Sequence, residues 1–325
     1  MKKFIYYQKA KYDAETGGAL ILVLMLLVIV SASLLFLTKN FQQNFKKNKL
    51  YSAQQQSFWY ALSIENLGLL SLRQTFEDNS NNINQSQIWA SFNGITYDID
   101  DSQLSISIKD MSSCFNINSF NINKQKTTTI PREISIYRDL LKLLEIDDDI
   151  VFSIWDFINL NPISVGDSVS ESIYENNFPP FKSANRTLSD FSEIRVVDGM
   201  TSQKFKQMRL LSCAIPSDKL SININTLNTE SAILLSAIYY PELTSEDAKK
   251  IIEDRPFDGW SSVDEFLSIS GLKNSTDKKY LSVKSDYFLI ESSVKTNNMT
   301  WKMSSLFYQN KNQWKNFYRF FGNNI

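Results

Sequence analysis

The sequence contains no histidine, so the side chains best suited to hold a metal or to form a disulfide are many carboxylates and two cysteines. Cys114 and Cys213 are too far apart in sequence to form a CxxC motif or a zinc knuckle. Without histidine, a Ser-His-Asp triad, a Cys-His dyad and histidine-ligated metals are excluded. Any bound metal would be a hard cation with oxygen ligands. The cysteines leave two interpretations open: a disulfide, if the chain lies outside the cytoplasm, or two separately buried thiols.

Motifs and composition argue against catalysis and against nucleic-acid binding. No G-x-S-x-G nucleophile motif occurs, so we expect no catalytic residues; a carboxylate-pair enzyme stays open on composition alone. Of the 325 residues, 43% are hydrophobic, which is enough for the cores of two modest domains. The net charge is -1 and falls to about -3 if residues 1–17, with four Lys, one Asp and one Glu, are removed. That charge gives no electrostatic footprint for nucleic acid.

The one long apolar run, from Ala19 to Leu37, directly follows Gly17-Gly18. It is about 19 residues long, enough for one helix to cross a bilayer. A small residue before the apolar stretch is the layout of a type IV prepilin signal, which is cut on the cytoplasmic side and leaves the apolar helix on the mature chain. The sequence therefore predicts cleavage at Gly17 or Gly18 by a prepilin peptidase.

Two other interpretations of the apolar segment stay open. It could be a plain signal anchor, or a secretory signal cut near Ser31-Ala32-Ser33, which would leave an apolar stub on the product. Flanking charge does not decide the orientation of the helix in the membrane. Four lysines lie on each side of the run, so the positive-inside rule favours neither orientation. They are Lys2, Lys3, Lys9 and Lys11 before the run, and Lys39, Lys46, Lys47 and Lys49 after it.

Hydrophobic periodicity divides the rest of the chain. Helical spacing predicts a long N-terminal helix from about 19 to 76, and the polar residues 77–87 predict a loop. Helical patterns then dominate from about 133 to 281. Alternation with period two predicts strands at 94–99, 104–108, 287–294, 301–308 and 314–321. A β-sheet interrupted by a long helical insertion is the simplest architecture.

Segments along nearly the whole chain resemble the K-type minor pseudopilins of the type II secretion system, the general secretion pathway protein K family. Each segment is a weak signal alone, but their order and spacing together are strong. The segments are Gly17-Gly18-Ala19-Leu20-Ile21 and residues 55–62, 110–118, 179–200, 213–216 and 222–226.

The resemblance implies an α+β fold, with a pilin-like long N-terminal helix plus an antiparallel β-sheet and a large α-helical domain inserted into the pseudopilin core. It also implies that Cys114 and Cys213 form a disulfide. The expected parts are a prepilin leader peptide at 1–17, a transmembrane helix at 18–38, the first part of the core at 39–119, the inserted α-helical domain at 120–285 and the C-terminal strands of the core at 286–325.

The function implied by the resemblance is that of a minor pseudopilin, which caps the tip of the periplasmic pseudopilus and helps to initiate its assembly for protein export across the outer membrane. The implied partners are the I- and J-type minor pseudopilins, other pseudopilins, the prepilin peptidase and the inner-membrane secretion platform. The implied location is a single pass through the inner membrane, with the bulk of the chain in the periplasm. The predicted protein is not an enzyme, needs no cofactor and binds no nucleic acid.

Position five of the mature chain is Leu22 or Val23, depending on the cleavage site, and it bears on how the subunit contacts its neighbours. Most pilins have a glutamate there, which is thought to neutralise the N-terminal amine of the adjacent subunit. A buried carboxylate without its partner is unfavourable. The missing acid therefore fits a subunit with no neighbour above it.

The family's inserted domain also has an ion-binding stretch. This chain has Asp156, Asn159, Asn161, Asp167 and Glu171 at the corresponding positions. Two expected aspartates are asparagines, which keep a carbonyl oxygen but lose the charge that sets calcium affinity. The resemblance thus implies a weakened calcium site.

Residues 222–281 also resemble the helix-hairpin-helix unit of DNA-binding competence proteins. The glycine hairpin that would offer N–H groups to phosphate is replaced by Tyr240-Pro241-Glu242-Leu243, and Pro241 has no N–H. We therefore interpret the segment as a helical packing unit. A membrane-anchored nucleic-acid-binding protein of this type is the alternative function.

Overall fold

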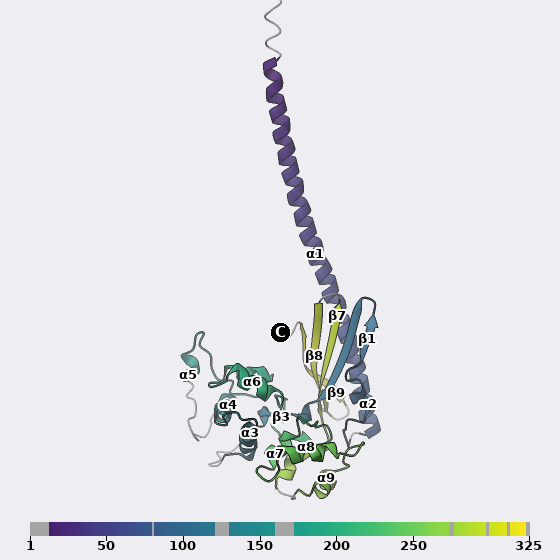
Figure 1. Ribbon diagram of the computed structural model, residues 1–325, viewed down its shortest axis with the longest axis vertical. Coiled ribbons are helices and arrows are strands. Elements are labelled where there is room, and N and C mark those ends of the chain that lie inside the picture. The colour runs from purple at the N-terminus through teal and green to yellow at the C-terminus, as the bar shows by residue number, and fades with distance from the viewer. Residues whose placement is uncertain are drawn as a thin grey trace, which may run out of the picture. The chain divides into compact units, whose positions relative to one another are not determined.

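The computed structural model describes residues 13–79, 81–120, 130–159, 172–272, 276–296, 299–310 and 313–322 (Figure 1). The chain divides into two compact units, Met1–Trp59 and Tyr60–Ile325. The first unit is helical in its described part, and the second contains the sheet and the other described helices.

Helix α1 (Asp13–Asn79) contains the predicted N-terminal helix and extends three residues beyond its predicted end. In the last turn, the Gln74 side chain donates a hydrogen bond to Asp78, one turn further on, at 3.1 Å. Such a contact between residues four apart supports a helix end that the polar composition alone assigns to a loop.

A five-stranded antiparallel sheet has the order β1-β2-β7-β8-β9. The strands are β1 (Thr96–Ile99), β2 (Ser102–Asp110), β7 (Tyr287–Thr296), β8 (Met299–Asn310) and β9 (Gln313–Gly322), and each overlaps a predicted strand. Strands β2 and β7 are hydrogen-bonded neighbours, with Asp110 opposite Phe288, although residues 111–286 separate them in the sequence. The expected fold, a pilin-like helix plus an antiparallel sheet with a helical insertion, is thereby confirmed.

The C-terminal part of α1 packs on one face of this sheet. Alternate residues of β2 and β7 are buried there, as period-two patterning requires; they include Leu104, Ile106, Ile108, Phe288 and Ile290. Gly68 permits a close approach, because a Cβ at this position would lie 2.9 Å from Cδ1 of Ile106 and 3.2 Å from Cδ1 of Ile290. Helix and sheet therefore share one core.

Residues 111–286 form the insertion, whose helices gather at one end of the sheet (Figure 1). Its apolar core already includes Phe115 and Ile117. The helical insertion follows directly after β2, and the expected division into domains, with the inserted domain at 120–285, stays a prediction. The elements are η1 (Met111–Ser113), β3 (Phe115–Asn116), η2 (Ile117–Phe120), α3 (Arg132–Leu143), α4 (Ile150–Ile158), α5 (Ser172–Glu175), η3 (Phe191–Val196), α6 (Ser202–Arg209), β4 (Ser212–Cys213), β5 (Ile222–Asn223), α7 (Ile233–Ile238), α8 (Ser245–Glu253), α9 (Val263–Ser270), η4 (Thr276–Tyr280) and β6 (Leu281–Ser282), and α2 (Ile88–Ser91) precedes the sheet.

Two parallel pairs of two-residue strands divide the insertion into consecutive modules. Strand β3 pairs with β4, which closes the first module. Strand β5 pairs with β6, which closes the second. The helices of each module lie between its two closing strands in the sequence.

Candidate functional site

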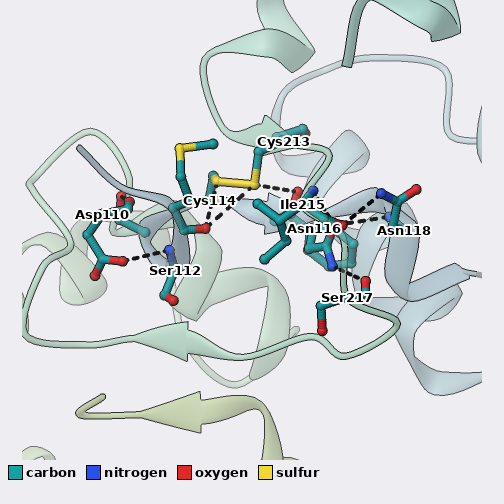
Figure 2. Close-up of a disulfide and its surroundings, with 12 residues drawn as sticks. Asp110, Ser112, Cys114, Asn116, Asn118, Cys213, Ile215 and Ser217 are labelled. Atoms are coloured by element: carbon teal, nitrogen blue, oxygen red, sulfur yellow. Dashed lines mark hydrogen bonds between the residues drawn. A yellow bond between two sulfur atoms is a disulfide. The ribbon is translucent and has the colours of Figure 1, made fainter. Parts of the chain in front are cut away.

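The junction between sheet and insertion contains the disulfide that the resemblance implies. The sulfur atoms of Cys114 and Cys213 are 2.07 Å apart and their Cα atoms 5.9 Å (Figure 2). The bond joins the residue before β3 to the second residue of β4. It therefore fastens the closing strand pair of the first module.

A buried carboxylate lies at the end of β2, beside the disulfide in Figure 2. Asp110 Oδ1 accepts a hydrogen bond from the backbone N–H of Ser112 at 2.8 Å. Its Oδ2 accepts from Thr226 Oγ1 at 2.5 Å, from Ser285 Oγ at 2.6 Å and from Asn223 Nδ2 at 3.2 Å. Asp110 thus ties the start of the insertion to the second module and to the segment that leads into β7.

These donors are neutral, so hydrogen bonds and not a salt bridge offset the burial of the Asp110 carboxylate. Burial raises the pKa of Asp110 above its ordinary value, and the four hydrogen bonds oppose that rise. The raised pKa shows that desolvation outweighs the hydrogen bonds. The Asp110 carboxylate is therefore a structural group whose contribution to the stability of the fold depends on pH.

The two modules are built on the same asparagine pattern. Asn116 Oδ1 accepts from the backbone N–H of Asn118 at 3.1 Å. Asn223 Oδ1 accepts from the backbone N–H of Asn225 at 3.0 Å. Each first asparagine thus fixes a turn directly after a closing strand.

The second asparagine of each pair bridges a distant backbone segment. Asn118 accepts from the N–H of Leu188 at 2.7 Å and donates to its carbonyl at 2.9 Å. Asn225 does the same with Trp260, at 2.8 and 2.9 Å. In both modules, the side-chain amide of the second asparagine binds a backbone N–H and C=O as a neighbouring strand would. The insertion therefore contains a structural repeat.

The repeat also shows what the disulfide adds. Asn116 is paired with Cys213 in the first module, and Asn223 is paired with Ser282 at the same position in the second. The second module therefore closes through hydrogen bonds and packing without a covalent bond.

A second buried carboxylate connects α1 to the sheet. Glu65 is 1% exposed, and Arg319 Nε of β9 donates to its Oε2 at 2.8 Å. Arg319 Nη2 donates to the other oxygen, and Ser305 of β8 also donates to Glu65. Glu65 is the first acidic residue after residue 17, a signal that could have marked it, but its partners are remote in sequence.

The stalk, residues 18–59 of α1, exposes most of its apolar side chains. Helix residues from Gly18 onward include a window of mean hydropathy 3.2 and satisfy the length and composition of a membrane span. Leu22 and Val23, the two candidates for position five, are 69% and 57% exposed. The helix is compatible with a single-pass membrane anchor, and cleavage at Gly17 or Gly18 stays a prediction.

The structure describes only part of the expected calcium ligand set. Asp156 and Asn159 are buried at the end of α4. The Asn159 amide donates to the carbonyls of Phe120 at 2.8 Å and Trp155 at 3.0 Å, so it is used in packing. Asn161, Asp167 and Glu171 lie outside the described residues. A calcium site there stays a prediction.

The segment that resembles a helix-hairpin-helix unit uses its characteristic residues for packing. Ala248, Ile252 and Phe266 are buried in the core of the insertion. Arg255 donates to the carbonyls of Leu227 at 2.6 Å and Ile224 at 3.4 Å, and burial lowers its pKa. These contacts are those of the helical packing unit that we inferred from the sequence.

The fold and the site define a pilin-like α+β protein with a long apolar N-terminal helix, an antiparallel sheet and a disulfide-stapled helical insertion. Two family models, both described as type II secretion system (T2SS), protein K, match residues 113–217 and 222–284, which together are just over half of the chain. Their boundaries coincide with the two modules. The chain belongs to the type II secretion system protein K family and is a minor pseudopilin, a structural component of that system.

Similar proteins extend the likeness to nearly the full length. The type II secretion system protein K of Pectobacterium carotovorum subsp. carotovorum is 29% identical over 303 residues, which covers 90% of this chain and 92% of the relative. That of Aeromonas hydrophila is 29% identical over 311 residues, covering 91% and 94%. A chain in the crystal structure of the GspK-GspI-GspJ complex from enterotoxigenic Escherichia coli is 27% identical, with a TM-score of 0.77 over 86% of this chain and 100% of that chain.

Proposed function

We propose that this minor pseudopilin caps the tip of the periplasmic pseudopilus and helps to initiate its assembly for protein export across the outer membrane. The observation that carries the proposal is the insertion of residues 111–286 between two neighbouring strands of a pilin-like sheet. A subunit this much larger than its sheet and helix would obstruct the stacking of another subunit over it.

The sequence of the membrane helix also supports a place at the tip of the pseudopilus. Neither Leu22 nor Val23 can neutralise the N-terminal amine of a neighbouring subunit. A tip subunit has no neighbour above it, so that pairing is not required. The apolar helix supplies lateral contacts, since its exposed side chains can pack against the helices of adjacent pseudopilins.

Processing and location follow from the same helix. A prepilin peptidase removes residues 1–17, and the helix from residue 18 crosses the inner membrane once. The mature chain then interacts with the inner-membrane secretion platform and with the other pseudopilins. The bulk of the chain lies in the periplasm. A disulfide between Cys114 and Cys213 suits that oxidising compartment.

The proposed partners in assembly are the I- and J-type minor pseudopilins. Support comes from the similar chain, which was crystallised in a GspK-GspI-GspJ complex. The proposed role is structural, without catalysis, without a required cofactor and without nucleic-acid binding. A weak calcium site at the end of α4 and in the following segment remains part of the proposal.

Co-purification of residues 45–325 with the soluble domains of the I- and J-type partners tests this function, together with a secretion assay in a deletion strain. We expect a ternary complex and impaired secretion. An apolar variant at position five, Leu22→Val, is the matched control and should secrete normally. Normal secretion after deletion, with no ternary complex, would overturn the proposal.

A further inference from the structure

The part of α1 between the apolar run and Ile64 carries positive charge without any negative charge. No Asp or Glu occurs between Gly18 and Ile64, whereas Lys39, Lys46, Lys47 and Lys49 lie within this stretch. All four lysine side chains are exposed. We call these four residues the lysine band; its charges lack the acidic partners that usually lie one turn away on a helix.

Helical geometry places three lysines of the band opposite two aromatic side chains, whereas Lys49 lies one turn after Phe45 on the aromatic side. At 3.6 residues per turn, Lys39, Lys46 and Lys47 fall within an arc of about 100°. Phe41 and Phe45 lie on the opposite side, where their exposed rings stack with centroids 6.4 Å apart. Basic and aromatic side chains on opposite faces next to an apolar span are typical of helices at a membrane surface.

The distance from the apolar run places the lysine band beside the headgroups. With a rise of 1.5 Å per residue, Lys39 lies about 3 Å beyond Leu37 and Lys49 about 18 Å beyond it. The headgroup region is roughly 5–8 Å thick on each side of the hydrocarbon core. An extended lysine side chain and a screening length of about 8–10 Å bring the outer lysines within electrostatic reach of that surface.

We propose that the lysine band binds the anionic headgroups of the phospholipid leaflet from which the stalk emerges. This inference rests on the membrane span in the proposed function. The apolar run itself holds Lys39 at the surface before any assembly forms, which favours lipid over an acidic partner protein as the occupant. Removal of residues 1–17 would also delete the four lysines on the other side, leaving the lysine band as the cationic anchor of the stalk.

Protection of lysine amines in lipid nanodiscs tests the inference. The full chain is placed in discs of phosphatidylcholine, with or without phosphatidylglycerol, and a water-soluble amine reagent is followed by mass spectrometry. At about 1 kcal/mol per lysine near an anionic surface, we expect anionic discs to slow the modification of the lysine band about fivefold. High salt should remove the effect, because screening weakens the attraction.

Lys302 and Lys315, exposed on β8 and β9, are the internal controls and should react at the same rate in both discs. A Lys46→Gln/Lys47→Gln/Lys49→Gln variant should reduce the protection of Lys39, and Lys302→Gln/Lys315→Gln should not. Equal rates for the lysine band in both discs would overturn the inference, as would protection only after acidic partner domains are added. The discs contain no other pseudopilin, so this result is independent of the tip role; failure of the chain to enter discs would instead contradict the membrane span.

Discussion

Glu65 and Arg319, 254 residues apart in the sequence, form an ion pair that fastens α1 to the edge strand β9. The Glu65 side chain is 1% exposed and that of Arg319 is 38% exposed. Two guanidinium nitrogens bind the two carboxylate oxygens, and the paired hydrogen bonds help to raise the pKa of Arg319. The interaction joins the first helix of the second compact unit to its last strand.

Arg319→Ala should destabilise residues 45–325 strongly, because it leaves the Glu65 carboxylate buried without its cation. We expect a loss of about 3 kcal/mol in the free energy of unfolding, the lower end for a broken buried pair since the guanidinium is partly exposed. Urea unfolding measures this. Lys315→Ala on the same strand is the control and should change stability by less than about 0.5 kcal/mol. A loss of less than about 0.5 kcal/mol for Arg319→Ala would contradict the assignment of a buried ion pair.

Gly68→Leu should loosen the packing of α1 on the sheet. Its side chain would enter space already occupied by the Cδ1 atoms of Ile106 and Ile290. Overpacking of this kind destabilises by about 1–3 kcal/mol. In Gly68→Ala, a gain of about 1 kcal/mol in helix propensity offsets a small shift of flexible side-chain ends, so we expect little change. Thermal unfolding of both variants tests this; equal stabilities for Leu and Ala would refute the close approach.

Asp110 should make the insertion less stable as pH rises. Since burial raises its pKa in the folded state above the ordinary 3.8, its contribution is fully present below about pH 3.8 and is lost as pH rises through the folded-state value. Asp110→Asn cannot titrate at this position. The stability of the wild type relative to Asp110→Asn, measured by urea unfolding from acidic to neutral pH, should therefore fall with pH and then become constant. A difference that rises with pH would mean that the hydrogen bonds outweigh burial.

Loss of the disulfide should weaken the first module more than the second. In the chain-entropy model, a closed loop of about a hundred residues contributes up to ~4–5 kcal/mol. We expect the Cys114→Ser/Cys213→Ser variant to lose less free energy of unfolding than this figure. The reason is that the second module closes the same strand arrangement without a disulfide. Hydrogen exchange should show faster opening of residues 114–120 and 212–216, with residues 222–227 less affected. Equal acceleration in both modules would contradict their separate closure.

Much of this fold is predictable from the sequence, because its largest elements have local patterns. The apolar period of α1 and the alternation in the strands predict these elements within a few residues. The family resemblance, and not spacing, predicts the disulfide between Cys114 and Cys213. The Glu65–Arg319 pair escapes prediction because neither residue has a local signal for its partner.

The repeat within the insertion was also missed, because its sequence signal is not specific. Asn116-Ile117-Asn118 and Asn223-Ile224-Asn225 are identical tripeptides, but the same tripeptide also occurs at residues 82–84 and 121–123. Strands of only two residues carry too little alternation to be recognised, and the bridging of Leu188 and Trp260 depends on long-range folding. Three of the five expected calcium ligands, Asn161, Asp167 and Glu171, lie outside the described residues, so that prediction stays untested.

The location of this subunit in assembled pseudopili tests the tip role most directly. Asp110 and Phe288 face each other on adjacent antiparallel strands, so an Asn-Gly turn can replace residues 111–287 and keep β2 paired with β7, with loss of only the terminal Tyr287–Tyr308 pair of the sheet. Immunogold electron microscopy would compare the wild type, Leu22→Glu, and Leu22→Glu combined with this replacement. We expect the wild type and Leu22→Glu to label one fibre end only, and the combined variant to label the shaft. Wild-type label along the shaft would contradict the tip role. Shaft label for Leu22→Glu alone would contradict the role of the insertion, because the missing acid and not the insertion would then have excluded the subunit.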